Sequence, residues 1–368
     1  MLISFSRINR IIGSIGLLLL TACQHPSEEC LSIAFTGDVL LDRGVRQQIQ
    51  RGGVEDLFAS VAPLFHQMDA TVINLECPVT SVRSPLHKKY IFRAEPRWME
   101  ELVKAGISHA ALANNHTMDQ GRSGLTDTYQ HLLSAGITPI GYGNTSSESC
   151  QPVVIKKGKI KVALFNSVTL PLENWVYLEN DPGICQQTTE EIEEEIKNFK
   201  RENPESYVVV ILHWGIEYQS LPDKEQKFLA GWLLQKGVDH VIGSHPHVVQ
   251  PIEVRTDSLT NDKHLVVYSL GNYISNMSAR RTDGGLMVKM ELVKDSTVRL
   301  NNCEYSLVWT ARPVQSEKKN HQLLPVNLPI ELVPLKARNS LKIFTNDARS
   351  LFSKHNRGIK EYTFYKKK

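Results

Sequence analysis

Five apolar runs in this sequence each end at side chains that can bind a metal ion or move a proton. One such side chain after an apolar run is most often part of a turn or a helix cap. Five successive runs that supply carboxylate, amide and imidazole groups instead indicate one shared site. The residues concerned are Asp38, Glu76, Asn115, His116, His213, His245 and His247.

The donor types of this set indicate which cofactor it would hold. Oxygen and imidazole donors without thiolates suit Mn²⁺, Fe or Zn²⁺ better than Cu(I) or an iron–sulfur cluster. Pro246 lies between His245 and His247, and its fixed φ gives that turn a defined shape. The two imidazoles can then face one ion or two neighbouring ions. We therefore expect a divalent metal cofactor, held as one ion or as two neighbouring ions.

The elements that would position these residues follow from the hydrophobic pattern. Short β-branched runs alternate with amphipathic stretches, which is typical of an α/β fold whose ligands gather at the carboxyl ends of strands. Two later runs, 285–293 and 297–309, have no helix between them and predict an antiparallel hairpin. The expected strands are 31–36, 71–75, 109–113, 160–166, 207–213, 240–243 and 265–270, and the expected helices are 97–105, 125–135, 189–200 and 224–236.

The N-terminal residues have the layout of an export signal. Arg7 and Arg10 precede the apolar run 11–20, which is about half as long as the roughly 20 residues needed to cross a bilayer. The string Leu-Thr-Ala-Cys at 20–23 resembles a bacterial lipobox, which implies cleavage before Cys23 and lipid attachment to its sulfur. Ordinary signal cleavage that leaves a free Cys23 is the alternative. We expect an exported protein, lipid-anchored to the bacterial cell envelope, and Gln24 favours the outer membrane if the cell has two membranes.

Composition and charge exclude several classes of protein. The 368-residue chain has 41% hydrophobic and 22% charged residues, which is typical of an ordinary globular protein. This composition excludes a disordered chain, a collagen-like chain and a polytopic membrane protein. Residues 312–368 hold 13 Lys and Arg against 4 Asp and Glu, while the rest of the chain holds 29 against 35. This basic tail has no binding module or interleaved aromatic residues, so we expect no nucleic-acid partner.

Four segments result from this reading. Several prolines follow Ala311 and the alternation of strands and helices stops there, so the tail is expected to be a loosely packed appendage. Cys30, Cys77, Cys150, Cys185 and Cys303 form no Cys-x-x-Cys pair, and outside the cytosol one or two disulfides are allowed without the sequence choosing which. The segments are a lipoprotein signal peptide (1–22), a short tether (23–30), the main domain (31–311) and the basic C-terminal appendage (312–368).

Taken in order, these strings resemble the CapA family of capsule and poly-γ-glutamate biosynthesis proteins, which is similar in fold to calcineurin-like metallophosphoesterases. The resemblance spans about residues 32 to 275. It rests on Thr36-Gly37-Asp38-Val39-Leu40-Leu41, Asn74-Leu75-Glu76, Phe92-Arg93-Ala94-Glu95-Pro96, Ala113-Asn114-Asn115-His116 with Asp119 and Gly121, His213-Trp214-Gly215 with Glu217 and Tyr218, Gly243-Ser244-His245-Pro246-His247, and Tyr268-Ser269-Leu270-Gly271-Asn272.

The resemblance implies a four-layer α/β/β/α sandwich with a two-metal site at the strand ends. Matched residue by residue, Asp38 and His247 would bind the first ion, Glu76 would bridge, and the second ion would be held by Asn115, His213 and His245. His116 would stand beside the ions as proton donor, because imidazole titrates near neutral pH. One departure concerns Leu40, which occupies the position where metallophosphoesterases usually have a histidine ligand. The first ion would therefore lose one imidazole ligand and keep that of His247, so the residues predict a metal site more directly than they predict catalysis.

Three further residues are candidates for catalysis or substrate binding. Arg43 and Arg93 can clamp a carboxylate or phosphate, since guanidinium binds both in bidentate fashion; the alternative is that each pairs with a nearby acid such as Asp42 or Glu95. Asp119 is a candidate to orient His116, with a helix-capping role as the alternative.

Two functions of different class remain in view. The first is a metal-dependent hydrolase or transferase acting on an anionic envelope polymer, for which the resemblance suggests poly-γ-glutamate. The second is a noncatalytic protein that binds the polymer and assists its assembly or export beside membrane subunits of a capsule synthase. The absence of an imidazole at Leu40 favours the second, and the donor set on an exported, membrane-tethered chain favours the first.

Overall fold

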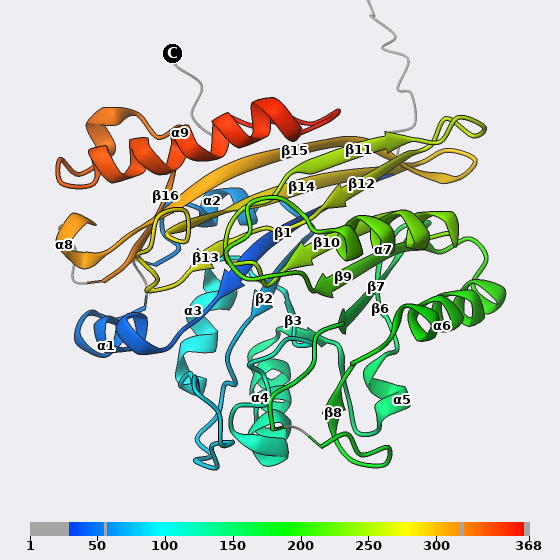
Figure 1. The fold of residues 1–368 in the computed structure, drawn as a ribbon, viewed down its shortest axis with the longest axis horizontal. Coiled ribbons are helices and arrows are strands. Elements are labelled where there is room, and N and C mark those ends of the chain that lie inside the picture. Colours follow the sequence, from blue (N-terminus) through cyan, green and yellow to red (C-terminus); the bar gives the residue numbers. More distant parts are fainter. Residues whose placement is uncertain (1–28, 55–56, 175, 317–319, 364–368) are drawn as a thin grey trace, which may run out of the picture.

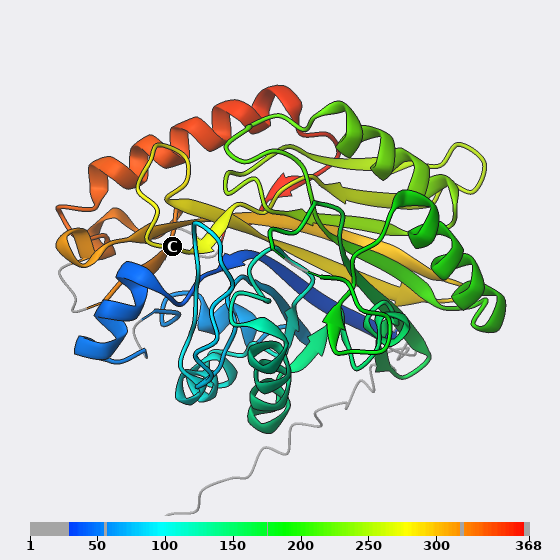
Figure 2. The same ribbon diagram turned by 60° about the horizontal axis from the view of Figure 1, so that its bottom comes forward.

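Two β-sheets pack face to face, and helices cover their outer faces (Figures 1 and 2). The computed structural model describes residues 29–54, 57–174, 176–316 and 320–363. The predicted signal peptide, most of the tether and the lipidation site Cys23 lie outside these residues. Among the residues described, no helix has the length and apolar character needed to cross a bilayer.

The larger sheet has nine strands and mixed direction. Its parallel part runs β1-β2-β3-β4, and on the other side β14, β15 and β16 continue it in antiparallel fashion from β1. Two short strands lie off this path, β13 against β1 and β17 against β15. The strands are β1 (Glu29–Val39), β2 (Ala70–Leu75), β3 (His109–Ala111), β4 (Thr138–Ile140), β13 (Asn272–Ile274), β14 (Gly284–Lys294), β15 (Val298–Ala311), β16 (Gln322–Pro325) and β17 (Lys360–Glu361).

The smaller sheet has six strands in the order β11-β12-β10-β9-β7-β6. Its centre is parallel, and β11 and β6 are antiparallel edges. A separate two-stranded ribbon joins β5 (Tyr142–Gly143) and β8 (Gly183–Ile184). The six strands are β6 (Val153–Lys157), β7 (Ile160–Val168), β9 (Tyr207–His213), β10 (His240–Ser244), β11 (Ile252–Thr256) and β12 (Lys263–Val267).

Three layers of apolar side chains hold these elements together. The first lies between the sheets and includes Ile33 and Phe35 of β1 against Leu164 of β7. Successive side chains of a strand point to opposite faces, so Ala34 of the same strand belongs to the second layer, under the helices of the larger sheet. The third layer lies between the smaller sheet and its helices. This arrangement confirms the predicted α/β/β/α order.

The helices start and stop where local chemistry favours it. Thr188 and Asp223 form capping boxes that satisfy the first backbone N–H groups of α6 and α7. Gly136, in the left-handed conformation, ends α4. The helices are α1 (Arg43–Gly52), α2 (Ala62–Phe65), α3 (Met99–Lys104), α4 (Gly121–Ala135), α5 (Ser146–Ser149), α6 (Thr189–Glu202), α7 (Lys224–Gln235), α8 (Pro313–Ser316) and α9 (Arg338–His355), with 3₁₀ turns at Pro96–Trp98 and Ile330–Leu332.

The prediction of a loosely packed C-terminal appendage is wrong for the described residues. Strand β16 pairs with β15, and α9 buries Leu341, Phe344 and Phe352 in the layer between the sheets. At the end of α9, Arg357 exchanges backbone hydrogen bonds with the edge strand β11, at 2.9 and 2.8 Å. The helix therefore extends the inner layer over strands of the larger sheet that the smaller sheet does not reach (Figure 2).

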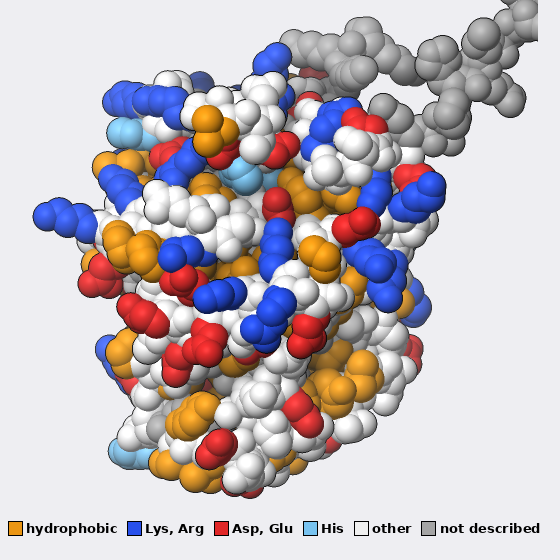
Figure 3. Space-filling view, turned by 90° about the vertical axis from the view of Figure 1, so that its right-hand side faces the viewer, with side chains coloured by type: hydrophobic (Ala, Val, Ile, Leu, Met, Phe, Trp, Pro, Cys, Tyr) orange, Lys and Arg blue, Asp and Glu red, His pale blue; other side chains and the backbone are white. Residues whose placement is uncertain are grey.

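A disulfide joins Cys150 to Cys185, which settles one pairing that the sequence left open. Cys185 belongs to the same buried cluster as Ala113 and Met118, which flank Asn115 in the chain. The bridge thus fastens the segment after β7 to the same region as the predicted site. Figure 3 shows the molecular face at the right of Figure 1, where basic and acidic side chains are interspersed.

Candidate metal centre

The predicted ligands converge where the carboxyl ends of the parallel strands of both sheets meet. Asp38 lies at the end of β1, and Glu76 directly follows β2. His213 ends β9 in the other sheet, and His245 and His247 follow β10. Residues that are up to 209 positions apart in the chain are therefore in contact. All six predicted metal ligands belong to this one region.

A β-bulge aims Asp38 into the site. The register of β1 against β2 shifts between Thr36 and Asp38, which turns the strand locally. Gly37 makes this possible, because a Cβ at this position would lie 2.0 Å from the carbonyl oxygen of Gly271. Only glycine lets the two backbones approach so closely. The Asp38 carboxylate then accepts a hydrogen bond of 2.7 Å from the amide of Asn74.

Asn115, His213 and His245 form one cluster of donor atoms, called here the second cluster. His213 Nε2 lies 3.1 Å from Asn115 Oδ1 and 3.1 Å from His245 Nδ1. Neighbouring ligands of an ion with bonds near 2.1 Å are spaced by about 3 Å. Burial and the nearby His245 hold the pKa of His213 well below its ordinary value, and burial lowers the pKa of His245 to about 4. Both rings are thus neutral at pH 7 and offer lone pairs.

Asp38 and His247 form the other cluster of donor atoms, called here the first cluster. His247 Nδ1 lies 3.1 Å from Asp38 Oδ2 and 3.1 Å from Asn272 Oδ1. Burial lowers the pKa of His247, but Glu76 and Asp38 outweigh burial and raise that pKa to about 10. Without a cation, the ring therefore carries the positive charge that its acidic surroundings require.

Glu76 connects the two clusters. Its Oε1 lies 3.8 Å from His213 Nε2 and 3.8 Å from His247 Nε2, and it has no hydrogen-bond partner although it is buried. Burial raises the pKa of Glu76 well above its ordinary value, and the Asp38 carboxylate adds to the rise. An orphaned buried carboxylate oxygen between two imidazoles fits a bridging metal ligand. The groups Glu76, His213 and His245, and Asp38, Glu76 and His247, each bring their donor atoms within 4.8 Å of one another.

The turn that carries His245 and His247 has an uncommon backbone conformation. His245 has φ of 100° and His247 has φ of 58°, in the region that non-glycine residues rarely adopt. Such residues cost of order 1–3 kcal/mol each and cluster at functional sites. The turn is held from outside, because the backbone N–H of Tyr218 donates to the carbonyl of Pro246 at 2.8 Å.

His116 lies next to the clusters in a polar triad with Asp119 and Lys88. Its Nδ1 lies 2.9 Å from Asp119 Oδ2, so a carboxylate that only accepts hydrogen bonds fixes the proton on Nδ1. Asp119 also accepts from Lys88 Nζ at 2.8 Å and from the backbone N–H of Phe92 at 2.7 Å. Burial lowers the pKa of His116, and the raising effect of Asp119 does not fully offset it. Nε2 is the ring atom left for chemistry.

The two predicted substrate arginines have different surroundings. Arg43 lies over the rings of Tyr90 and Phe92, at 4.6 and 4.9 Å, and lines a cavity of about 90 Å³ that also contains Glu76, His116 and His247. Arg93 instead donates to the carbonyl of Thr80 at 2.7 Å and to Glu95 at 2.9 Å. Arg93 is therefore a buried structural residue, as its alternative pairing with Glu95 predicts, and only Arg43 faces the site.

Four residues that lie in or beside the site had no role predicted from the sequence. Asn272 contacts His247, and Lys88 holds Asp119. Glu217 Oε1 lies 4.0 Å from His247 Nε2 at the rim of the cavity, with 43% of its side chain exposed. Asn114 is buried and accepts from the backbone N–H groups of residues 116 and 117, which shapes the loop. Asn272, Glu217 and Asn114 lie within the strings that carried the resemblance, so a signal existed for all but Lys88.

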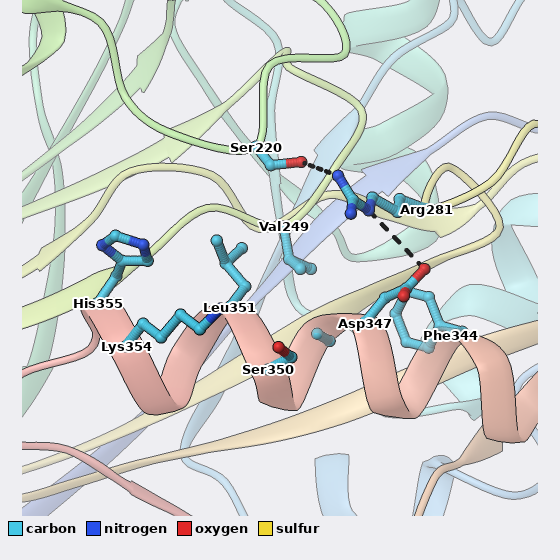
Figure 4. Close-up of a pocket in the computed structure, with 10 residues that line it drawn as sticks. Ser220, Val249, Arg281, Phe344, Asp347, Ser350, Leu351, Lys354 and His355 are labelled. Atoms are coloured by element: carbon cyan, nitrogen blue, oxygen red, sulfur yellow. Dashed lines mark hydrogen bonds and ion pairs between the residues drawn. The ribbon is translucent and has the colours of Figure 1, made fainter.

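A second cavity, of about 190 Å³, lies between the loop that carries Ser220 and helix α9 (Figure 4). Its apolar wall comes from α9, and its basic side chains are Arg281, Lys354 and His355. Arg281 donates to Ser220 at 3.2 Å and lies 3.8 Å from Asp347, which makes two closer bonds of 2.7 Å to Arg280. The single acid of this cavity is thus largely occupied, and the cavity carries net positive charge.

Known proteins resemble the chain in sequence. It is 28% identical over 276 residues to PGA biosynthesis protein CapA of Bacillus subtilis, which covers 74% of this chain and 70% of the relative. It is 27% identical over 284 residues to capsule biosynthesis protein CapA of Bacillus anthracis, covering 76% and 68%. A probable polyglutamine synthesis accessory protein of Mycobacterium tuberculosis is 27% identical over 198 residues, covering 50% and 52%.

Solved structures and a family description complete the comparison. NAD nucleotidase of Haemophilus influenzae aligns with a TM-score of 0.49 at 11% identity, covering 85% of this chain and 62% of that one. A 5′-nucleotidase precursor of Thermus thermophilus aligns with a TM-score of 0.46 at 13% identity, covering 88% and 59%. Residues 32–277, more than half of the chain, match the family described as Bacterial capsule synthesis protein PGA_cap. The chain belongs to this bacterial capsule synthesis family.

Proposed function

We propose that this protein acts in capsule or poly-γ-glutamate biosynthesis, as a metal-dependent hydrolase or transferase on an anionic polymer. The main observation behind this proposal is the pair of donor clusters that share Glu76. His116 and Arg43 line the same cavity as Glu76. The printed names of the Bacillus relatives support the biological setting. Export and lipid anchoring through Cys23 belong to the same proposal, since they would place the protein beside an envelope polymer and its synthase.

The donor set suits Mn²⁺, Fe or Zn²⁺ in either cluster. Asp38, Glu76 and His247 would hold one ion, and Glu76, Asn115, His213 and His245 the other. When bound, two such ions activate a water or hydroxyl near neutral pH and stabilise negative charge on the substrate.

The protein's own groups would move the proton and hold the polymer. With the Nδ1 proton directed to Asp119, neutral His116 can accept a proton at Nε2 from the attacking group and return it to the leaving oxygen or nitrogen. Lys88 keeps Asp119 and the loop in place, since its ammonium also donates to the carbonyl of Asn115 at 2.7 Å. The Arg43 guanidinium can bind a carboxylate or phosphate at the cavity.

The neighbouring basic cavity supports an anionic chain rather than a single small substrate. Tyr218 lines the metal cavity, and Ser220, two residues later, lines the basic cavity, where it accepts a hydrogen bond from Arg281. A polymer bound at the metal cavity through one carboxylate would bring further carboxylates toward this second basic surface. Such repeated contacts raise the affinity for long chains above that for short ones.

The test compares the full-length wild-type protein with His116→Asn, in detergent and with Mn²⁺. Substrates are γ-glutamyl oligomers and a generic phosphodiester, and the readout is turnover together with bound metal. We expect turnover to fall about 10²- to 10⁴-fold while bound metal stays unchanged. His131→Asn is the control, because His131 is partly exposed on α4 and pairs with Asp127. Equal turnover of the two variants would contradict the assigned role of His116.

A specific observation favours a noncatalytic alternative. Leu40, an apolar residue, lines the metal cavity where an imidazole ligand is usual. In that case the protein would bind the polymer and assist a membrane synthase without breaking a bond. Full complementation of polymer production by His116→Asn in cells, with no turnover by the purified wild type, would select this alternative.

A further inference from the structure

Asn272 is placed against Asp38 by an unusual strand. After β12 ends at Val267, the chain leaves the smaller sheet, and β13 pairs in parallel with the last residues of β1 in the larger sheet. This pairing sets Asn272 directly opposite Asp38, and the backbone N–H of Asp38 donates to the carbonyl of Gly271 at 2.9 Å. The Asn272 side chain is buried, with 2% exposed, and lines the metal cavity.

The orientation of the Asn272 amide is fixed by its amino group. Nδ2 donates to the backbone carbonyl of Thr282 at 2.8 Å. A carbonyl only accepts hydrogen bonds, so the amino end must lie on that side and Oδ1 must point the other way. Oδ1 accordingly lies 3.1 Å from His247 Nδ1, which is itself 3.1 Å from Asp38 Oδ2.

We propose that Asn272 Oδ1 is a ligand of the cation held by the first cluster, in place of the imidazole that Leu40 does not supply. This inference rests on the metal site of the proposed function. His247 Nδ1 lies 3.1 Å from an oxygen of Asp38 and 3.1 Å from the oxygen of Asn272, which is the spacing expected of neighbouring ligands around one ion. A single Nδ1–H of His247 can serve only one of two oxygens at full strength, whereas an ion satisfies both oxygens and the nitrogen lone pair.

The assignment makes the two clusters chemically unequal. The first cluster then offers oxygen from Asp38, Glu76 and Asn272 and one nitrogen from His247. The second cluster offers two oxygens and the two nitrogens of His213 and His245. Carboxylate and carbonyl oxygen suit Mn²⁺ or Mg²⁺, whereas imidazole suits Zn²⁺ and Fe. Asn272 therefore directs the first cluster toward a hard cation such as Mn²⁺.

The experiment measures metal binding by the full-length protein, independently of activity. The variants are Asn272→Leu, Asn272→Asp, Leu40→His with Asn272→Leu, and the control Ser275→Ala, which removes a hydroxyl from the same cavity. Titration calorimetry with Mn²⁺ and with Zn²⁺ gives the number of ions bound and their affinities. Circular dichroism verifies that each variant is folded.

We expect Asn272→Leu to lose at least about tenfold in affinity for one of two Mn²⁺ ions, because even outer contacts of a metal site carry 10- to 100-fold. Asn272→Asp retains both ions, and the double variant recovers the lost site with a preference for Zn²⁺. Ser275→Ala binds as the wild type does. Two Mn²⁺ ions bound by Asn272→Leu with wild-type affinity would overturn the inference.

Diffraction from wild-type crystals soaked in Mn²⁺ tests the same point without a variant. An anomalous peak within about 2.4 Å of Asn272 Oδ1 supports the assignment, by comparison with the 2.0–2.2 Å bonds of similar ions. A first-cluster peak more than 3 Å from Oδ1 overturns it and leaves Asn272 as a hydrogen-bond partner of His247. A wild-type protein that binds no cation at all would instead contradict the proposed function.

Discussion

Cation binding by the first cluster should strengthen steeply as the pH rises from 6 to 8. Without a cation, the pKa of His247 is raised to about 10, chiefly through Glu76 and Asp38 against the opposing effect of burial. Its ring therefore carries a second proton throughout this range. That proton has to leave before the ring can bind an ion, so metal binding releases it.

The size of the effect follows from proton linkage. One proton released per ion raises the association constant tenfold per pH unit, or about 1.36 kcal/mol, and about 100-fold between pH 6 and 8. Glu76 acts in the same direction, because burial and then Asp38 raise its pKa. His213 and His245 contribute no proton, since burial lowers the pKa of His213 and brings the pKa of His245 to about 4.

The assay is titration calorimetry of the wild-type protein with Mn²⁺ at pH 6, 7 and 8. Two buffers with different ionisation enthalpies at each pH give the number of protons released, which we expect to be at least one. The matched variant is His247→Gln, which keeps a polar side chain but cannot hold the proton. It should bind the ion more weakly and with a shallower pH dependence. Wild-type affinity that is constant from pH 6 to 8, with no proton released, would refute the reasoning.

Three further predictions concern stability. Replacing Cys150 and Cys185 by Ala should lower the free energy of unfolding in urea by about 3–4 kcal/mol, given their separation of 35 residues; an unchanged midpoint would show that the bridge does not constrain the chain. Phe344→Ala should cost about 3–5 kcal/mol, whereas Ile343→Ala, on the exposed side of α9, should cost under about 1 kcal/mol; equal losses would contradict the packing of α9. Burial lowers the pKa of His240 to about 3, so its contribution to the free energy of unfolding is complete above pH 6.5 and is lost as the pH falls toward 3. His240→Gln should therefore make the urea midpoint less sensitive to pH below 6.5. An unaltered pH profile of the midpoint would count against this.

The positions of the candidate metal ligands at strand ends could be predicted from the sequence because each depends on a local pattern. A β-branched run that stops at a polar residue predicts a strand end, and the carboxyl ends of parallel strands share one edge. Tyr207–His213 illustrates this, since the expected strand has the observed bounds and ends at the candidate ligand His213. That the five strand ends share one site was inferred from their joint occurrence, whereas the two-sheet arrangement that brings them together came from the family resemblance.

The orientation of long side chains could not be predicted from the sequence. Arg43 and Arg93 are both arginines near an acid, and nothing local separates them. The structure does so through distant partners, because Phe92 and Tyr90 support Arg43 at the cavity while Thr80 and Glu95 hold Arg93 in the interior. Each contact depends on how the segment 80–95 folds back, and that segment contains no regular strand or long helix.

Two elements were missed for different physical reasons. The prolines after Ala311 suggested an irregular tail, yet residues 338–355 contain no proline, and the spacing of Leu341, Phe344 or Thr345, Ala348 and Phe352 is that of an amphipathic helix. That signal was present and was outweighed. Strand β13 gave no such signal. It has only three residues, and so short a segment shows no hydrophobic periodicity of its own.

The fold and the site depend on each other because the site is built from side chains of both sheets. His247, after β10 of the smaller sheet, contacts Asp38 at the end of β1 in the larger one, and His213 of β9 contacts Asn115 beyond β3. A cation in either cluster would therefore join the two sheets at the edge where polar side chains replace the apolar layer between them. Because it would bind only this folded arrangement, a concentration 100 times its Kd would stabilise the protein by about 2.7 kcal/mol. The buried charges that destabilise this edge without a cation are thus the same groups that would hold it together with one.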